Sequence, residues 1–568
     1  MPDLYAIDNF GGMNQRDPSD ALVSKSHQMV QGGFRQAAGT AAESPYMLNV
    51  DYDPKGLRKR LGSALYASLT GVLVASDELL GGFEFLPANG AGRVQFIVSK
   101  KTFYTDQAAS GTFVQINAST GAAYAHAADV SKWTVTFADG HAFVGLDGAN
   151  NIQTYKYGAD LDPAMTSGNL YENAYGAATN TITGTWATGT FIVASIHERL
   201  LFSDGQTVME YTPMASTLSS GIYDLAGATA GAYHALGRIK LMAAFVPQLR
   251  DSNEAILYMG TSKGMQMVTG FERESDRTLP VENAPEPLNH KAWCKTKNSL
   301  CYLTATKDIA MVQGATVLTN IGARLKASDG TGFLDGMNIT TSETYATALY
   351  LADKEQAWLD FCTDSDTIND ARVVVDMKRG EPMPGMPLSV LEDRVRLQPW
   401  TITDPSNNNG FAHLYQSIGG VRGVLGAGYV YTANSGRNDQ GDIAISAKYR
   451  TPVFTTGAPF VFNQKQFLRE HLRTEEAGDW PATVKVFLDG SDTEEFSWTF
   501  NQVNSSTLIV GDAVVGDTFG TFGQVRTFHR TQRRAEAIQI EISNEAVDQD
   551  FVLASVGVSY EIGTQEVA

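Results

Sequence analysis

The sequence predicts an all-β protein in which short antiparallel strands are joined by tight turns. Thr, Val, Tyr and Phe recur in short alternating runs that Gly, Asn and Asp interrupt, and the chain holds 54 Gly but only 19 Pro. Alternation with a period of two residues is typical of strands, whereas apolar repeats of helical period are hard to find after Gly62. With 43% apolar and 18% charged residues, long disordered stretches are not expected.

Residues 1–62 are predicted to form an extended N-terminal docking arm. Gly11-Gly12 and Gly32-Gly33 interrupt regular structure, and the segment has no apolar periodicity. A segment with little core of its own is expected to lie on another surface.

Residues 63–440 are predicted to form a β-propeller. Asp-Gly pairs at 139–140 and 204–205 stand between apolar runs and favour hairpin turns. Paired runs recur roughly every 40–60 residues, within the range of blade-sized repeats. A small antiparallel sheet cannot bury both faces alone, so radial stacking of such sheets would build the core. The paired runs are 94–99 with 102–104, 133–137 with 141–146, 199–203 with 208–211, 255–259 with 264–268, 299–304 with 309–312, and 347–351 with 356–362.

Residues 441–568 have a different texture, with longer alternating strands at 443–449, 482–488, 496–500, 537–542 and 551–560. This pattern predicts a separate β-sandwich-like domain.

The composition limits the classes of function. The net charge of −19 repels polyanions at long range and disfavours phosphate binding of the usual basic kind. Cys294, Cys301 and Cys362 show no Cys-x-x-Cys spacing, so reduced thiols fit better than disulfides or structural zinc. No secretory signal is visible at the N-terminus, and no run reaches the ~18 apolar residues of a membrane helix. We expect assembly inside a cell, in a reducing cytosol.

No motif makes a convincing catalytic, cofactor or metal site, and we expect none. Residues 260–264 match Gly-x-Ser-x-Gly, but strands stand on both sides, which favours a hairpin turn over a nucleophile elbow. Asp51-x-Asp53 starts like a calcium loop, but Lys55 occupies a ligand position.

One acidic cluster leaves two interpretations open. Asp360, Asp364, Asp366 and Asp370 could hold a cation or hydrolyse a glycoside, because both tasks use paired carboxylates. A solvated loop after a strand is the plainer interpretation, since turns favour Asp.

Two basic groups stand out in this acidic chain. One is Arg58, Lys59 and Arg60, and the other is the set Arg526, Arg530, Arg533 and Arg534. Arginine makes bidentate pairs with carboxylates, so both groups are candidates for docking on acidic surfaces of neighbouring subunits. Ordinary solvated strand ends are the alternative.

The N-terminal residues carry a family resemblance. Gly11-Gly12 before Asn14-Gln15, then Asn49 in a short strand, then the exit Gly56-Leu57-Arg58-Lys59-Arg60, resemble the start of bacteriophage tail nozzle proteins, the tail tubular protein B family of short-tailed phages. The resemblance implies a structural virion protein of the viral tail and not an enzyme. It implies a ring, commonly a hexamer, below the portal and head-to-tail adaptor proteins, which continues the channel for DNA ejection.

The resemblance also implies partners and interface residues. Tail fibre or tail tip proteins would bind the ring of subunits, and viral DNA would pass without specific binding, which agrees with the acidic charge. The candidate interface residues are Gly11, Gly12, Asn14, Asn49, Arg58, Lys59, Arg60, Arg533 and Arg534. The competing hypothesis is a phage tail propeller that binds or depolymerises host surface glycan through the Asp360 cluster.

Overall fold

The structure is a computed structural model of the chain, and it is all-β. It describes residues 3–17, 22, 27–30, 33–36, 42–53, 56–86, 93–106, 110–117, 122–138, 141–155, 170–172, 188–196, 199–212, 231–245, 255–269, 277–363, 368–382, 394–402, 411–439, 443–455, 464–475, 480–502 and 524–562. Helical structure within these ranges includes the 3-10 helix η4 (Ile321–Leu325) and the α-helix α2 (Ile339–Tyr345). No helix of the described part is long and apolar enough to cross a membrane.

Seven sheets of four antiparallel strands are formed by the described residues between Ser63 and Ala433. The first three sheets are β10 (Leu79–Phe85), β11 (Val94–Ser99), β12 (Phe103–Asp106) and β13 (Val114–Gln115); β14 (Trp133–Ala138), β15 (His141–Leu146), β16 (Gln153–Tyr155) and β17 (Leu170–Glu172); and β18 (Ile192–Ile196), β19 (Arg199–Ser203), β20 (Val208–Tyr211) and β21 (Gly231–His234).

The fourth to seventh sheets follow the same order of strands. They are β22 (Ile239–Phe245), β23 (Ile256–Thr261), β24 (Gly264–Thr269) and β25 (Arg277–Pro280); β26 (Trp293–Lys295), β27 (Leu300–Leu303), β28 (Ile309–Gln313) and β29 (Thr316–Leu318); β30 (Thr347–Leu351), β31 (Gln356–Phe361), β32 (Ala371–Asp376) and β33 (Arg396–Thr401); and β34 (His413–Ser417), β35 (Gly420–Leu425), β36 (Tyr429–Ala433) and β9 (Ser63–Ser68).

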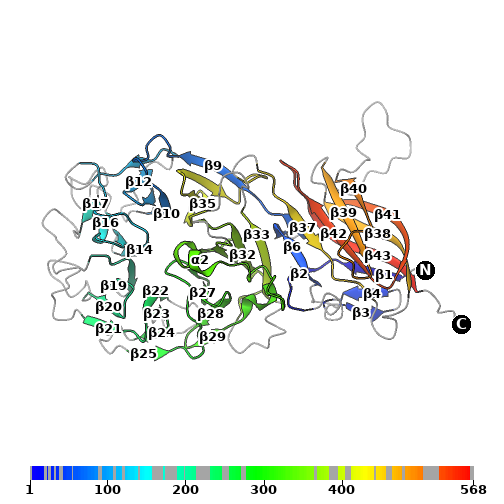
Figure 1. Cartoon of the computed structure of the whole chain (residues 1–568), viewed down its shortest axis with the longest axis horizontal. Coiled ribbons are helices and arrows are strands. Elements are labelled where there is room, and N and C mark those ends of the chain that lie inside the picture. The colour runs from blue at the N-terminus through cyan, green and yellow to red at the C-terminus, as the bar shows by residue number, and fades with distance from the viewer. Residues whose placement is uncertain are drawn as a thin grey trace.

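The seven sheets follow one another in a circle, which we call the sheet ring (Figure 1). Hydrophobic clusters join the first sheet to the second, the third to the fourth, and the fourth to the fifth. The first strands β14 and β18, β26 and β30, and β30 and β34 also lie side by side. The circle closes where β34 of the last sheet contacts β10 of the first. Strand β9, which precedes all the others of the ring in sequence, completes the last sheet by pairing with β36.

The middle strands of these sheets are buried on both faces. Every residue of β11, β15, β23, β31 and β32 is buried. A sheet covered by neighbours on both sides needs apolar residues on both faces, which explains the continuous apolar runs in these strands. Burial of this surface, at about 25 cal/mol per Å² of apolar area, is the main source of stability for the ring.

The hairpins predicted between residues 94 and 362 are confirmed. Each predicted pair of runs forms two antiparallel strands that are hydrogen-bonded to each other. Ala138 lies opposite His141 in one such pair, and Thr261 lies opposite Gly264 in another. Ser262 therefore lies in a turn between two strands, and the prediction of a hairpin in place of a nucleophile elbow is also confirmed. Residues 139–140 themselves lie outside the described residues.

A second unit, which we call the C-terminal unit, contains two larger sheets (Figure 1). The eight-stranded sheet contains β3 (His27–Val30), β4 (Gly33–Gln36), β1 (Asp3–Ile7), β43 (Val552–Ile562), β38 (Lys465–Glu475), β41 (Gln524–Ala535), β7 (Val50–Asp53) and β8 (Gly56–Lys59). The five-stranded sheet contains β40 (Phe496–Asn501), β39 (Pro481–Leu488), β42 (Ile538–Asn544), β37 (Ala447–Arg450) and β6 (Tyr46–Leu48). A parallel pair, β2 (Phe10–Met13) and β5 (Ala42–Ser44), lies beside them.

The two large sheets share one hydrophobic core. Strand β39 alternates between buried and more exposed residues along most of its length, so that Val484 and Val486 face the interior. Tyr5 of the eight-stranded sheet stacks on Phe454, with ring centroids 4.2 Å apart, and both belong to the same cluster as Val484. This core continues into the fifth and sixth sheets of the ring, so the two units are packed against each other.

The N-terminal arm is part of the C-terminal unit. Strand β1 pairs with β43 over Asp3–Ile7, β6 pairs with β37, and β8 pairs with β43. Ile7, Met47 and Leu57 are fully buried in the shared core. Residues 1–62 were expected to lack a core of their own. In the structure they contribute core residues to the sheets that roughly the last 120 residues form. The arm docks on its own chain.

Candidate functional site

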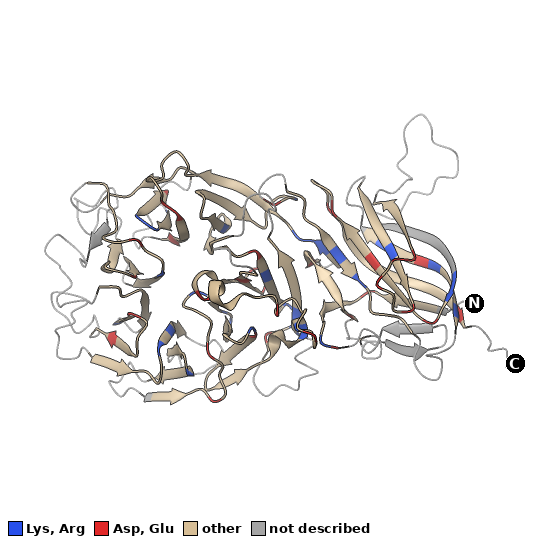
Figure 2. Cartoon of the chain, viewed as in Figure 1, with Lys and Arg blue, Asp and Glu red and all other residues tan. Residues whose placement is uncertain are grey.

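The candidate site is the junction, by which we mean residues 10–15, 42–62 and the parts of the sheet ring and C-terminal unit that they contact. Strand β33 of the sixth ring sheet lies against β2, β6 and β7 of the arm. Strand β6 continues the five-stranded sheet by pairing with β37. Strands β2, β6 and β7 therefore lie where the C-terminal unit meets the sheet ring, and Figure 2 shows several Lys and Arg positions at this boundary.

Gly11 and Gly12 allow backbones to approach each other closely. A Cβ atom on Gly11 would lie 2.9 Å from the backbone of Ala42 in β5. A Cβ atom on Gly12 would lie 2.5 Å from the backbone nitrogen of Leu397 in β33. Backbone atoms cannot move aside as a flexible side chain can, so both positions require glycine. Gly-Gly is needed because β2 is sandwiched between another arm strand and the sheet ring.

Asn14 organises a polar cluster just after β2. Its side chain is fully buried and donates to Glu43 Oε2 at 2.7 Å and to Asp17 Oδ2 at 3.0 Å. Its side-chain oxygen, Oδ1, accepts hydrogen bonds from the backbone N–H groups of Arg16 and Asp17, both at 3.1 Å. All of these bonds are made within the arm, so Asn14 fixes the turn that leaves β2.

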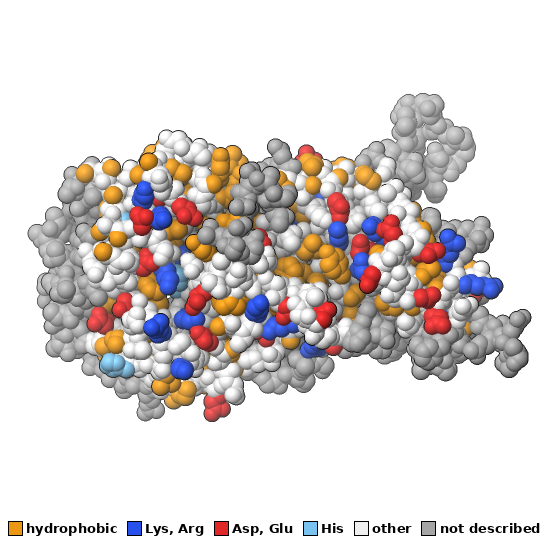
Figure 3. Space-filling model, viewed as in Figure 1, with side chains coloured by type: hydrophobic (Ala, Val, Ile, Leu, Met, Phe, Trp, Pro, Cys, Tyr) orange, Lys and Arg blue, Asp and Glu red, His pale blue; other side chains and the backbone are white. Residues whose placement is uncertain are grey.

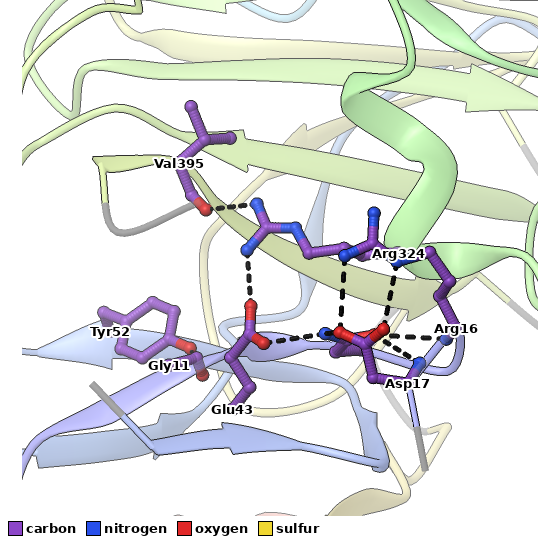
Figure 4. A network of polar contacts seen from close by, with 8 residues as sticks. Gly11, Arg16, Asp17, Glu43, Tyr52, Arg324 and Val395 are labelled. Carbon is purple, nitrogen blue, oxygen red and sulfur yellow. Dashed lines mark hydrogen bonds and ion pairs between the residues drawn. The ribbon is translucent and has the colours of Figure 1, made fainter. Parts of the chain in front are cut away.

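Arg324 of η4 links this cluster to the ring (Figure 4). Its guanidinium donates to Glu43 Oε1 at 2.6 Å and to the carbonyl oxygen of Val395 at 2.6 Å. The side chains of Arg324 and Glu43 are 5% and 13% exposed, so the pair is shielded from water and is stronger than a surface ion pair. Tyr52 also donates a hydrogen bond to the carbonyl oxygen of Gly11.

Asn49 and Arg60 form the second polar cluster. Asn49 has a left-handed backbone, with φ of 54°, a conformation that Asn tolerates better than most residues. Its amide nitrogen donates to Thr401 Oγ1 and to the carbonyl oxygen of Ser446, both at 2.9 Å. Thr401 ends β33 of the ring and Ser446 precedes β37, so one side chain connects both units.

All five N–H groups of Arg60 have acceptors. Nε donates to Asn49 Oδ1 at 2.9 Å, and the two terminal nitrogens donate to both carboxylate oxygens of Asp439 and to the carbonyl oxygens of Leu61 and Thr401. The side chains of Arg60 and Asp439 are 5% and 7% exposed. A buried bidentate pair of this kind repays the cost of desolvation only with full hydrogen bonding, which Arg60 has.

Arg58 and Lys59 bind the last strands of the chain. Arg58 pairs with Asp550, with Nε 3.0 Å from Oδ2. Lys59 is 2% exposed and donates to Asn544 Oδ1 at 2.9 Å and to the carbonyl oxygen of Ala546 at 3.0 Å. Burial lowers the pKa of Lys59 to about 8, against the opposing effect of the Asp550 carboxylate.

The structure thus brings together seven of the nine candidate interface residues. Gly11, Gly12, Asn14, Asn49, Arg58, Lys59 and Arg60 all lie in the junction. Their contacts described above are made inside the chain, and the sequence analysis had assigned them to contacts between subunits. Burial commits Gly12 and Arg60 to these internal contacts, whereas the side chain of Arg58 remains 37% exposed.

Arg533 and Arg534 lie elsewhere. Both are exposed on β41, an outer strand of the eight-stranded sheet, and Arg533 is 3.7 Å from Glu495. Side chains of this kind are available to solvent or to a partner, and an exposed pair contributes little to folding.

The Asp360 cluster is divided by the fold. Asp360 is fully buried and accepts two hydrogen bonds from Arg372, at 2.6 and 2.9 Å, and the Arg372 guanidinium lies over the rings of Trp358 and Trp400. Asp370 accepts from the backbone N–H and the hydroxyl of Thr363. Asp364 and Asp366 lie outside the described residues. Within the described part of the chain, no three His, Cys, Asp or Glu side chains are grouped to hold a metal ion.

Sequence reasoning missed the partners of the arm. Glu43, Arg324, Thr401 and Asp439 complete the two polar clusters, and Asp550 pairs with Arg58; most of them lie hundreds of positions from the residues they bind. The clue available in the sequence was chemical, because buried basic residues must have acidic partners somewhere in a chain of charge −19.

Comparisons with known proteins name no family for this chain. No protein-family model and no curated protein matches it. Two solved structures show distant similarity. The computationally designed Ika8 protein is 9% identical with a TM-score of 0.32, and the match covers 65% of this chain and 99% of that one. A chain of the mitotic checkpoint complex is 12% identical with a TM-score of 0.34, and covers 70% and 95%. Scores this low support no argument about fold or function.

Proposed function

We propose that the chain is a structural protein of a bacteriophage tail, of the tail nozzle kind. In this proposal the seven sheets are the blades of a β-propeller, and the two larger sheets form a β-sandwich-like platform. The observation that carries this proposal is the position of the residues on which the family resemblance rests. Gly11, Gly12, Asn14, Asn49 and Arg60 form the polar and close-packed junction between the two units.

A rigid junction suits a load-bearing virion part. Breaking a buried ion pair that has complete hydrogen bonding requires much free energy, because it leaves a charge buried without a partner. Such pairs therefore hold two units in one orientation. Arg324 with Glu43, and Arg60 with Asp439, lie at two separate points of the same boundary. Two such points resist both hinging and twisting. A subunit that keeps its shape allows a ring of copies to stay closed while DNA passes.

The proposed assembly is a ring of subunits, commonly a hexamer, located in the virion tail after assembly in the host bacterial cytoplasm. Its partners would be the head-to-tail adaptor proteins above and tail fibre or tail tip proteins below. The net charge of −19 supports a role as a conduit, because an acidic wall repels DNA phosphates and does not hold them.

The faces available for these partners include β41. Arg533 and Arg534 are exposed there, while the first basic group is committed inside the junction. We therefore assign contacts with acidic neighbours to this strand. Figure 3 also shows hydrophobic side chains on the face where the ring meets the C-terminal unit.

Electron microscopy tests the proposal. Phage particles carrying this chain are labelled with gold-conjugated antibodies raised against the C-terminal unit, and the label is expected at the tail, below the portal. Purified chain is expected to sediment as a monomer and to form closed rings when portal and adaptor proteins are added. Label on the capsid, or no label on virions whose tails are intact, would overturn the proposal.

The glycan hypothesis is tested with the same material. Host polysaccharide is incubated with purified chain, and released reducing ends are measured for the wild type and for Asp364→Asn and Asp370→Asn. The structural proposal expects no turnover in any of them. Turnover by the wild type that either substitution abolishes would establish the enzyme in its place.

A further inference from the structure

The first strands of several ring sheets line an open cavity that the proposed tail assembly does not require. Its volume is about 290 Å³, and its walls come from the first strands of five sheets, β10, β14, β26, β30 and β34. Among the lining residues are Phe83, Trp133, Trp293, Leu349 and Tyr415. A second cavity of about 200 Å³ adjoins the first through His290, which lines both. Binding sites in proteins commonly occupy such a place, where several elements converge.

Two lysines of these cavities have aromatic rings as neighbours in place of carboxylates. Nζ of Lys291 lies 4.6 Å from the ring centroid of Trp133, and Nζ of Lys132 lies 5.5 Å from that of Phe191. Within the described residues, no carboxylate oxygen forms an ion pair with either amine. Cation–π contacts contribute about 0.5–2 kcal/mol, less than the cost of removing an ammonium group from water.

Two histidines add hydrogen-bonding groups to the same walls. His413 Nδ1 accepts from the backbone N–H of Gly82 at 3.4 Å, so in the neutral ring the proton is on Nε2, where it can be donated. His290 is 5% exposed, and its Nε2 has no hydrogen-bond partner. Its ring lies edge-on to Phe191, with centroids 5.2 Å apart. A buried polar atom without a partner is uncommon in a folded protein and indicates a place for a bound group.

The electrostatics of the cavity favour an anion. Burial lowers the pKa of Lys291 to about 7, and the Asp147 carboxylate only partly opposes this effect. Burial, and then the charge of Lys291, lower the pKa values of His290 and His413 well below the usual histidine range. Glu84 also lines the cavity, but it accepts from Ser417 and from the backbone N–H of Ile418. The ion pair of Glu84 is with Arg93, 4.0 Å away, and not with Lys291, so a bound anion would be the direct partner of the lysine.

We propose that this cavity binds a small carboxylate with a flat apolar body, such as an aromatic acid. The carboxylate would lie between the Lys291 ammonium and the Nε2–H of His413, and the body would pack among Phe83, Trp133 and Trp293. Inorganic phosphate fits less well, because its remaining oxygens would face aromatic rings. The volume is at the lower end of the roughly 300–1,000 Å³ of sites for drug-sized molecules, which points to a smaller ligand.

Titration calorimetry and tryptophan fluorescence with the full chain test the proposal. The probes are benzoate, its neutral isostere benzyl alcohol, and inorganic phosphate. Benzoate is expected to bind and to change the fluorescence, with benzyl alcohol and phosphate at least about tenfold weaker, or about 1.4 kcal/mol. A bound anion raises the pKa of Lys291, so the protein is expected to take up protons when it binds benzoate near pH 7.5. This uptake would be seen as a binding heat that varies with the ionisation enthalpy of the buffer. His290, His413 and Glu84 line the same cavity as Lys291, and Lys132 lines the adjoining one, so their titration contributes to this response.

Matched variants assign the effect to one side chain. Lys291→Met keeps an apolar stem of similar length and is expected to weaken benzoate binding about tenfold or more, while the exposed Lys263→Met leaves it unchanged. The proposal is overturned if benzoate gives no heat at about 10 mM, if benzyl alcohol binds as well as benzoate, or if Lys291→Met binds like the wild type. The first two comparisons need only the wild type, so they decide the matter even if Lys291→Met does not fold.

Discussion

Replacement of Arg60 by methionine tests how strongly the junction holds the two units together. The change removes the cation that pairs with Asp439 and keeps a side chain of similar reach. Asn49 Oδ1 still accepts a hydrogen bond from the backbone N–H of Thr401 at 2.9 Å, so it does not lose its last partner. The main loss of stabilising interactions therefore falls on Asp439, whose side chain is 7% exposed and loses its cationic partner. Breaking a buried pair in this way costs about 3–5 kcal/mol. We expect Arg60→Met to lower the free energy of unfolding by that amount.

The assay is guanidinium unfolding followed by intrinsic fluorescence and by far-UV circular dichroism. The Arg60 guanidinium lies 5.6 Å from the ring of Trp400, so fluorescence reports on the junction itself. A chain with two packed units need not unfold in one step, and both signals are therefore fitted to a common set of transitions. In Arg60→Met we expect the transition of the C-terminal unit to separate from that of the sheet ring and to occur at lower denaturant concentration.

Two further variants make the result decisive. Adding Asp439→Asn to Arg60→Met removes the orphaned charge and is expected to recover more than about 1 kcal/mol, as a coupled pair requires. Arg533→Met is the matched control, since its pair with Glu495 is exposed and contributes less than about 1 kcal/mol. The reasoning fails if Arg60→Met and Arg533→Met are equally stable, or if Asp439→Asn brings no recovery.

Three other predictions concern the arm. Gly12→Ala places a methyl group against the backbone of Leu397 and should lower the melting temperature by the equivalent of about 1–3 kcal/mol, whereas Gly71→Ala, which meets nothing within 4 Å, should melt like the wild type. Lys59 has a pKa of about 8 in the folded state, below its unfolded value of 10.5, so the unfolded state binds more protons between these pH values. The free energy of unfolding should therefore rise from pH 8 to pH 10.5 relative to that of Lys59→Met. Parallel curves of this free energy against pH for the two proteins would argue against a buried ammonium. Deleting residues 1–62 removes β1 and β6 to β8 but spares β9, so limited proteolysis should leave the sheet ring and digest the C-terminal unit, and protection of both units would contradict the role assigned to the arm.

Local pairings could be predicted from the sequence, because a hairpin is encoded by adjacent residues. The Asp-Gly pair at 204–205 and the turn at Ser262 each lie between two short apolar runs, and the strands formed where those signals indicated. The break in texture near residue 440 likewise marks the change from four-stranded sheets to longer strands.

The placement of the arm could not be predicted in this way. Leu4 lies opposite Ser559, and Asn49 binds residues about 350 to 400 positions away. A single sequence carries no local signal for such contacts, because they depend on how complete units pack. The apolar residues of the arm, such as Tyr5, Met47 and Leu57, are spaced too irregularly to show a period, although each is buried. Arg58 and Arg60 pair with carboxylates, as their chemistry suggested, but these carboxylates belong to the same chain, and Lys59 binds amide and carbonyl oxygens instead.

Strand β9 closes the sheet ring, and β1 pairs with β43 at the other extreme of the chain. Both pairings must wait for residues made late in synthesis. At about 5–20 residues per second, β1 waits roughly half a minute or more for β43 to leave the ribosome. Only a full-length copy can therefore reach the native state, and a chain truncated near its end would also leave its beginning unfolded. The topology acts as a test of completeness, which would keep truncated copies out of any larger assembly.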